Sequence, residues 1–288
     1  MFRLFIFLNP GHVYLPDTGL NLLELAKQFI NFKKHHMKAI INRQTTLLKK
    51  IKLYLYSVFI LFAMCSMPAV AFAQTKAVLP AVGTHIILGN MDGIGIAVTV
   101  QSPSAEKTPL QIACVFEYTE NDIFTPPALP LEANGMAHLD KGLNGMITEL
   151  RKSGQFAGHA FETLLIDIPN GTIVPQKLLL IGLGDRKKFD PEMMKTVGAI
   201  GMREALRLGV TSYAHASDLK DGGVDSPTAL IAENVLKGAM GAYHTQIYLK
   251  GKGMSAFKPM KKITLLAGPP FYQITGDALK KVIDPNVH

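Results

Sequence analysis

One short stretch, residues 177–185, places the strongest constraint on how this 288-residue chain folds. It reads Lys-Leu-Leu-Leu-Ile-Gly-Leu-Gly-Asp, an apolar block that ends in two glycines. A short apolar run bounded by glycines is typical of a strand that is covered on both faces of a sheet. Asp190 and Pro191 then open a segment with helical spacing of its apolar residues. Strand, glycine turn and helix make half of a βαβ unit, which predicts an α/β fold.

Alternating strand and helix patterns extend this prediction over residues 84–268. Further strands are expected at 84–89, 94–100, 110–118, 160–168, 210–216, 246–249 and 262–267, and helices at 140–153, from 190, at 226–243 and from 275. We expect a single three-layer α/β domain, with a mixed β-sheet flanked by helices and antiparallel pairing where the first hairpin forms one edge. Residues 74–83 are expected to be a linker, and 269–288 a C-terminal tail with a truncated helix.

Positive charge is concentrated in residues 1–73, which hold 9 of the 30 Lys and Arg residues but 2 of the 22 Asp and Glu residues. The rest of the chain therefore has 21 basic and 20 acidic residues and is nearly neutral. Because a basic patch on the folded part would be the signature of nucleic-acid binding, no nucleic-acid partner is predicted.

The basic segment has the features of a secretory signal peptide over residues 37–73. Lys49, Lys50 and Lys52 precede an uncharged, mostly apolar run that ends in Ala-Phe-Ala at 71–73. Cleavage is expected between Ala73 and Gln74, giving an exported, periplasmic or secreted protein that meets the membrane only during export. A retained membrane anchor is the alternative, since the run is long enough to span a bilayer. Residues 1–36 are interpreted as an upstream extension, with Met37 favoured over Met1 as the start.

The mature part contains no arrangement of residues that specifies catalysis. Its histidines form neither an H-E-x-x-H pair nor a zinc-type cluster with cysteine. His138 and His215 each have an aspartate close by in sequence, but such pairs arise by chance, and we interpret them as satisfied surface or core histidines. No catalytic residue, metal ligand or cofactor is therefore assigned to this chain.

The glycine turn after the central strand is the candidate ligand site. A full dinucleotide fingerprint needs a third glycine, but Lys187 stands in its place. A tight structural turn is the favoured interpretation. The alternative is anion or nucleotide binding by the backbone N–H groups of the turn, because ligands of α/β sheets bind at the carboxyl ends of strands. The residues concerned are Gly182, Leu183, Gly184, Asp185 and Arg186.

Several segments together resemble the N-terminal domain of the leucyl (cytosol) aminopeptidase family. They are Leu-Asp-Lys-Gly-Leu-Asn-Gly at 139–145, Ser-Gly-Gln-Phe-Ala-Gly at 153–158, the stretch 177–184, and the helix pattern at 232–243. The resemblance covers roughly residues 110–267 and implies a macro-domain-like fold.

The same resemblance bears on function. In that family the chemistry belongs to a C-terminal domain that holds two divalent metals, zinc or manganese, partly through an Asn-Thr-Asp-Ala-Glu-Gly-Arg segment that this sequence lacks. The expected function is that of an exported, non-catalytic, stand-alone N-terminal domain acting in binding or assembly, with a protein partner or as a homo-oligomer. One alternative is an aminopeptidase-associated protein whose catalytic domain is missing or on another chain. The other is a nucleotide or ADP-ribose binding module.

Overall fold

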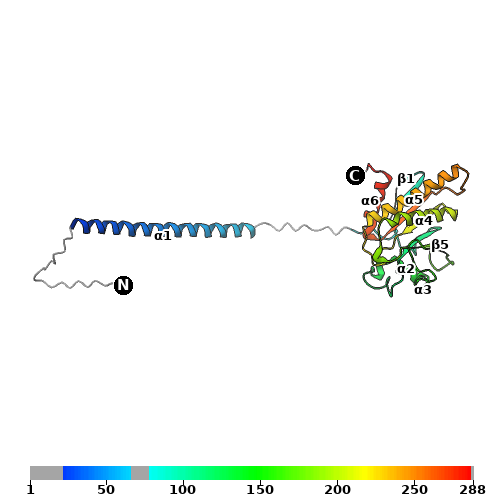
Figure 1. Cartoon of the computed structure of the whole chain (residues 1–288), viewed down its shortest axis with the longest axis horizontal. Coiled ribbons are helices and arrows are strands. Elements are labelled where there is room, and N and C mark those ends of the chain that lie inside the picture. The colour runs from blue at the N-terminus through cyan, green and yellow to red at the C-terminus, as the bar shows by residue number, and fades with distance from the viewer. Residues whose placement is uncertain (1–21, 66–77, 287–288) are drawn as a thin grey trace, which may run out of the picture. The chain divides into compact units, whose positions relative to one another are not determined.

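The computed structural model describes residues 22–65 and 78–286, which belong to two compact units, 1–75 and 76–288 (Figure 1). The described part of the first unit is one helix, α1 (Leu22–Cys65), which passes through Met37 without a break. The predicted cleavage site, Ala73 and Gln74, lies outside the described residues. Within the two described ranges, no helix is both long and apolar enough to cross a membrane.

The second unit is built on one seven-stranded mixed sheet, so the predicted α/β fold class is confirmed. In spatial order the strands are β1-β2-β7-β6-β3-β5-β4, and the five central strands run parallel. Their bounds are β1 (His85–Met91), β2 (Ile94–Val100), β3 (Gln111–Val115), β4 (Thr163–Asp167), β5 (Lys177–Gly182), β6 (Ser212–Ala216) and β7 (Lys262–Ala267).

Both edges of the sheet are antiparallel, whereas the sequence predicted antiparallel pairing at one edge. The predicted edge is the hairpin of β1 and β2, which turns at Asp92 and Gly93. At the other edge β4 pairs antiparallel with β5. Only residues 168–176 join these two strands, too short a connection for the crossover that a parallel pair requires.

Helices cover both faces of the sheet and account for the alternating burial of the central strands (Figure 1). Ile112, Cys114, Leu179 and Ile181 belong to the core cluster beneath α4 (Met193–Arg207), α5 (Thr228–Gly251) and α6 (Tyr272–Ile283). Their neighbours along β3 and β5 belong to the opposite cluster, with α2 (Gly135–Gly142) and α3 (Met146–Ser153). This two-faced burial is why the central strands read as continuous apolar runs.

The single helix predicted at 140–153 is wrong, because two short helices occupy this region. Asn144 and Gly145 have positive φ angles of 56° and 83°, which end α2 and redirect the chain into α3. Asp140, the first residue of the predicted helix, lies buried within α2. Its carboxylate accepts hydrogen bonds from the backbone N (3.0 Å) and hydroxyl (2.7 Å) of Thr148, so it caps the following helix rather than its own.

The strand predicted at 246–249 is also wrong, since α5 continues through it to Gly251. Ile247 and Tyr248 favour a strand by type, but both are exposed and lie on the end of a helix. No glycine or proline interrupts the helix between 242 and 250, so the helix propagates. At the other end of the unit, α6 packs onto β1 and β2 with Leu279 fully buried, so residues 272–283 are part of this unit.

Two glycines bring the backbones of α4 and α5 into direct contact. A Cβ atom built on Gly238 of α5 would lie 1.8 Å from the carbonyl oxygen of Lys195, and one on Gly198 of α4 would lie 2.0 Å from that of Val235. Real Cβ atoms do not approach an oxygen this closely, so the helix pair depends on both glycines.

We expect Gly238→Ala to lower the free energy of unfolding by about 2–4 kcal/mol, because the added methyl group must push α4 and α5 apart. Gly241→Ala on the same helix is the matched control, since a Cβ there meets nothing within 4 Å. The control should raise stability by up to about 1 kcal/mol through helix propensity. Urea denaturation measures both, and equal effects of the two variants would contradict close contact of the helices.

Candidate ligand pocket

The turn predicted as a ligand site uses its backbone donors within the chain. The N–H groups of Gly182, Leu183 and Gly184 donate to the carbonyl oxygens of Glu162 (2.8 Å), Val115 (2.8 Å) and Gly158 (2.9 Å). A Cβ on Gly182 would lie 2.0 Å from the carbonyl oxygen of His159. The glycines thus let the 158–162 segment pack against the end of β5, as a structural turn requires.

The two charged residues of the turn are also engaged. The Asp185 carboxylate accepts from the backbone N of Lys187 (2.9 Å) at the start of the 3₁₀ turn Arg186–Lys188. Arg186 donates to the carboxylate of Asp122 at 2.6 Å. A ligand role for these residues stays a prediction. The three backbone N–H groups of the turn that would bind an anion already donate to carbonyl oxygens of the chain.

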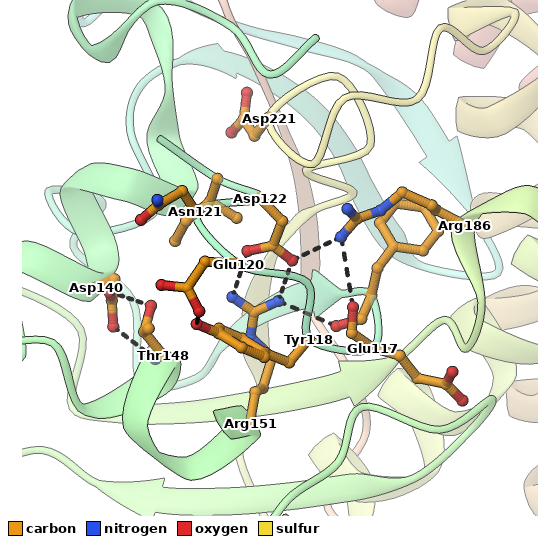
Figure 2. A network of polar contacts seen from close by, with 12 residues as sticks. Glu117, Tyr118, Glu120, Asn121, Asp122, Asp140, Thr148, Arg151, Arg186 and Asp221 are labelled. Carbon is orange, nitrogen blue, oxygen red and sulfur yellow. Dashed lines mark hydrogen bonds and ion pairs between the residues drawn. The ribbon is translucent and has the colours of Figure 1, made fainter. Parts of the chain in front are cut away.

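Arg186 belongs to a buried ion group of two arginines on one carboxylate (Figure 2). Arg151 of α3 forms two hydrogen bonds to Asp122, at 2.8 and 3.1 Å, and a third to the carbonyl oxygen of Phe116. The Arg151 and Asp122 side chains are 0% and 2% exposed. The guanidinium groups also lie 5.8 Å from the ring centroids of Tyr118 and Phe116. Sequence reasoning did not predict this group, because its members are far apart in the chain.

A cavity of ligand size lies elsewhere, at the carboxyl ends of β2, β6 and β7. Its volume is about 390 Å³, within the range of pockets that hold small molecules. The walls are mostly apolar and come from the three strand ends and from the first residues of α2, α5 and α6. Residues from these elements include Leu265, Ala267, Ile231, Ala232, Phe271 and Thr275.

Two aspartates on the loop after β6, Asp218 and Asp221, contribute carboxyl groups to the pocket wall. Asp218 Oδ2 accepts from the backbone N of Cys114 (3.3 Å), and Asp221 Oδ2 accepts from that of Met136 (3.1 Å). The two carboxyls are also close enough to affect each other's pKa. Burial, reinforced by the neighbouring Asp221, holds the pKa of Asp218 well above its usual range, and burial raises the pKa of Asp221 as well. Both shifts favour the protonated form of each carboxyl relative to a surface aspartate.

His215 on β6 forms part of the same pocket wall. It is 1% exposed, and neither ring nitrogen has a hydrogen-bond partner. The interpretation of this residue as a satisfied histidine is therefore wrong. Burial lowers the pKa of His215 to about 4, so the ring is neutral at physiological pH and offers one donor and one acceptor.

No site was predicted from the sequence at residues 218–225, which follow β6. The available signal was position, because Asp218 directly follows a predicted strand, and open α/β sheets bind ligands at strand carboxyl ends. His138, also singled out from the sequence, lines this pocket as well. Across residues 22–65 and 78–286, no group of three or more His, Cys, Asp or Glu side chains is placed to hold a metal ion.

The central part of the chain matches a known family model. Residues 119–252 match the model of the N-terminal domain of the cytosol aminopeptidase family. A probable cytosol aminopeptidase of Roseiflexus castenholzii is 30% identical over 129 residues, which cover 44% of this chain and 26% of the relative. One from Thermosynechococcus vestitus is 40% identical over 70 residues, covering 24% and 14%. The chain thus aligns with about a quarter or less of the length of these two relatives.

Solved structures with similar folds include an Oceanobacillus iheyensis macrodomain with ADP, at 14% identity and a TM-score of 0.45, covering 70% of this chain and 98% of that one. A tomato leucine aminopeptidase mutant has 18% identity and a TM-score of 0.45, covering 66% and 37%. The α/β assignment itself comes from the strand order and the two helical layers described above.

The unpaired His215 predicts a loss of stability in acid. A group whose folded pKa is depressed from 6.5 to about 4 binds a proton more readily when unfolded, so its neutral form stabilises the fold fully above pH 6.5 and progressively less below it. Lowering the pH from 7.5 to 4.5 should therefore reduce the free energy of unfolding of the wild type by about 2–3 kcal/mol more than that of His215→Leu. Urea denaturation of both proteins at the two pH values measures it, and a constant difference would contradict a buried neutral ring.

Proposed function

Residues 119–252 of this chain belong to the N-terminal domain of the cytosol aminopeptidase family, and on that premise we propose that the 78–286 domain binds a small ligand in the pocket at the ends of β2, β6 and β7. The observation that carries the proposal is the unpaired His215. Buried polar atoms are normally hydrogen-bonded, and both ring nitrogens of this side chain lack a partner in the wall of a cavity of ligand size. A bound ligand would supply those hydrogen bonds.

The lining supports binding rather than catalysis. A nucleophile is activated by a base within hydrogen-bond reach, and neither nitrogen of His215 contacts a hydroxyl or thiol group. A histidine whose pKa is about 4 is also a weak base at neutral pH. The Asp218–Asp221 pair accepts hydrogen bonds from backbone N–H groups, which fixes its place in the wall.

Filling the pocket tests this function. Ligand-observed NMR with a fragment library should find compounds that bind the wild-type protein and lose binding in Ser217→Trp, because an indole at this half-buried lining position occupies the cavity. Ser153→Trp places the same side chain at an exposed position of α3, outside the pocket, and should bind like the wild type. Equal binding by all three proteins would place the ligand site elsewhere and contradict the proposal.

We also infer a second role, assembly with an aminopeptidase catalytic domain carried on another chain. This inference comes from the two relatives, which are named probable cytosol aminopeptidases and are about four to seven times as long as the parts this chain aligns with. In this role the domain contributes binding and no chemistry. Hydrolysis of leucine p-nitroanilide by the purified chain alone, supplied with zinc or manganese, would contradict both the binding and the assembly function.

We further propose that the chain is exported and that its leader is removed after Ala73. The support is the order of lysines, apolar run and Ala-Phe-Ala in residues 49–73.

N-terminal sequencing of the protein from the exported fraction of expressing cells should begin at Gln74. Ala73→Tyr removes the small residue that signal peptidase requires, so this variant should accumulate as the longer precursor. Ala77→Tyr, past the expected site, is the matched control and should be cleaved normally. A native protein that retains residues 37–73 would contradict cleavage and favour a retained leader.

A further inference from the structure

The charge of the pocket lining is acidic. Among the lining residues the acids are Glu132, Asp218 and Asp221, and the one Lys or Arg is Lys220. Lys220 already forms an ion pair with Asp225, donates to the carbonyl oxygen of Ser226 (3.3 Å) and lies 5.3 Å from the ring centroid of Phe271. The one lysine of the lining is therefore already engaged by partners within the chain.

The acid pair is held at a fixed place. Asn134, the N-cap of α2, is fully buried and donates to the backbone oxygen of Asp221 (3.1 Å) and to that of Ile123 (2.9 Å). Asp221 in turn accepts from the backbone N of Met136 in the first turn of α2. The 218–221 loop is thus fastened to α2 through buried hydrogen bonds, which presets the carboxyl groups before any ligand arrives.

His215 is the second, independent indication that this wall meets a ligand. It projects from β6, whose carboxyl end leads directly into Ser217 and Asp218, and it lines the same cavity. A neutral imidazole with two unpaired nitrogens adds one donor and one acceptor to the site. The polar part of the wall therefore combines a negative pair with a neutral hydrogen-bonding ring, and the remainder is largely apolar.

We propose that this pocket takes a small apolar amine, with the protonated amino group at Asp218 and Asp221, the apolar body against residues such as Ile231 and Leu265, and any further polar atom at His215. This specificity rests on the proposed ligand-binding function and names the chemical class of the ligand. An ammonium group has three donors and no acceptor, which suits a site of carboxyl oxygens. The positive charge of an ammonium group beside the two carboxyl groups would also favour their ionised form, so the amine and the pair stabilise each other's charge.

The same charges disfavour phosphate-bearing ligands. A diphosphate brings negative charge to a wall that holds two carboxyl groups and no unpaired Lys or Arg among its lining residues. Like charges in a partly desolvated site repel more strongly than in water. The pocket should therefore prefer a cationic ligand to a neutral ligand of the same size, and a neutral ligand to an anionic one.

Three probes that share one apolar chain test this order: hexylamine, hexan-1-ol and hexanoate. Titration of the purified protein at pH 7, followed by ¹H–¹⁵N NMR shifts of the pocket residues, should give a Kd for the amine about tenfold or more below that of the alcohol. Hexanoate should bind more weakly than the alcohol. A wild-type protein that binds the alcohol as tightly as the amine overturns the proposal.

The double variant Asp218→Asn/Asp221→Asn assigns the preference to the acid pair. Asparagine keeps an acceptor oxygen for the Cys114 and Met136 amides, and it removes the negative charge. We expect the amine to lose about tenfold in affinity while the alcohol is unchanged. Asp167→Asn on the edge strand β4 is the matched control, because it removes an exposed carboxylate outside the pocket. If the double variant does not fold, Asp218→Asn alone carries the comparison.

The outcomes separate this proposal from the function on which it rests. Alcohol and amine that bind equally in the pocket, or an amine whose affinity survives the double substitution, overturn the amine specificity and leave small-ligand binding in place. ADP-ribose that shifts the pocket residues at lower concentration than the amine also overturns it and supports a nucleotide ligand. If no probe shifts any pocket residue, and Ser217→Trp changes no fragment binding, both the specificity and the proposed function fail.

Discussion

The Asp122 carboxylate holds together three segments that the chain order keeps apart. It bonds Arg151 from α3 and Arg186 from the turn after β5, and it sits on the loop that follows β3 (Figure 2). Removing the Asp122 carboxylate would leave the buried guanidinium of Arg151 without its counter-charge, and breaking a buried ion pair in this way typically destabilises a protein by about 3–5 kcal/mol. The carboxyl ends of β3 and β5 are therefore closed by this group, with aromatic rings beside both guanidinium groups.

In the other half of the sheet, the carboxyl ends of the strands are not closed by the Asp122 ion group. At β2, β6 and β7 the strand ends open into a cavity lined by Asp218 and by the buried side chains of Asp221 and His215. At the ends of β3 and β5, two arginines bind one carboxylate. At the ends of β2, β6 and β7, two carboxyl groups line the cavity together. Both ring nitrogens of His215 lack a partner in the same cavity wall, which leaves hydrogen-bonding capacity for a ligand. This division favours the acidic loop over the turn at Arg186 as the candidate site, and a ligand role for that turn stays a prediction.

Residues that have no side chain, or a short polar one, set the geometry around this frame. Gly182 lets the 158–162 segment cross the end of β5, and the Gly198–Gly238 contact lets α4 and α5 lie against each other. Asp140 secures the junction of α2 and α3 by capping the next helix through Thr148. Asn134 links α2 to the acidic loop in a similar way, because its side chain caps α2 at Ala137 and donates to the carbonyl oxygen of Asp221. Each is a contact between segments that are separated in the sequence or run in different directions. The small size of one partner makes the contact possible.

Local pattern alone determined the α/β class, the central strand at 177–182, the first hairpin and the family resemblance of the middle of the chain. Apolar periodicity and glycine placement are properties of neighbouring residues, so they can be read without the fold. The antiparallel pairing of β4, the helical state of 246–249, the partner of Arg186 and the pocket were decided by tertiary structure. Arg186 meets Asp122, and Asp221 meets α2, only when strands are ordered β6-β3-β5, and nothing in local spacing specifies that order.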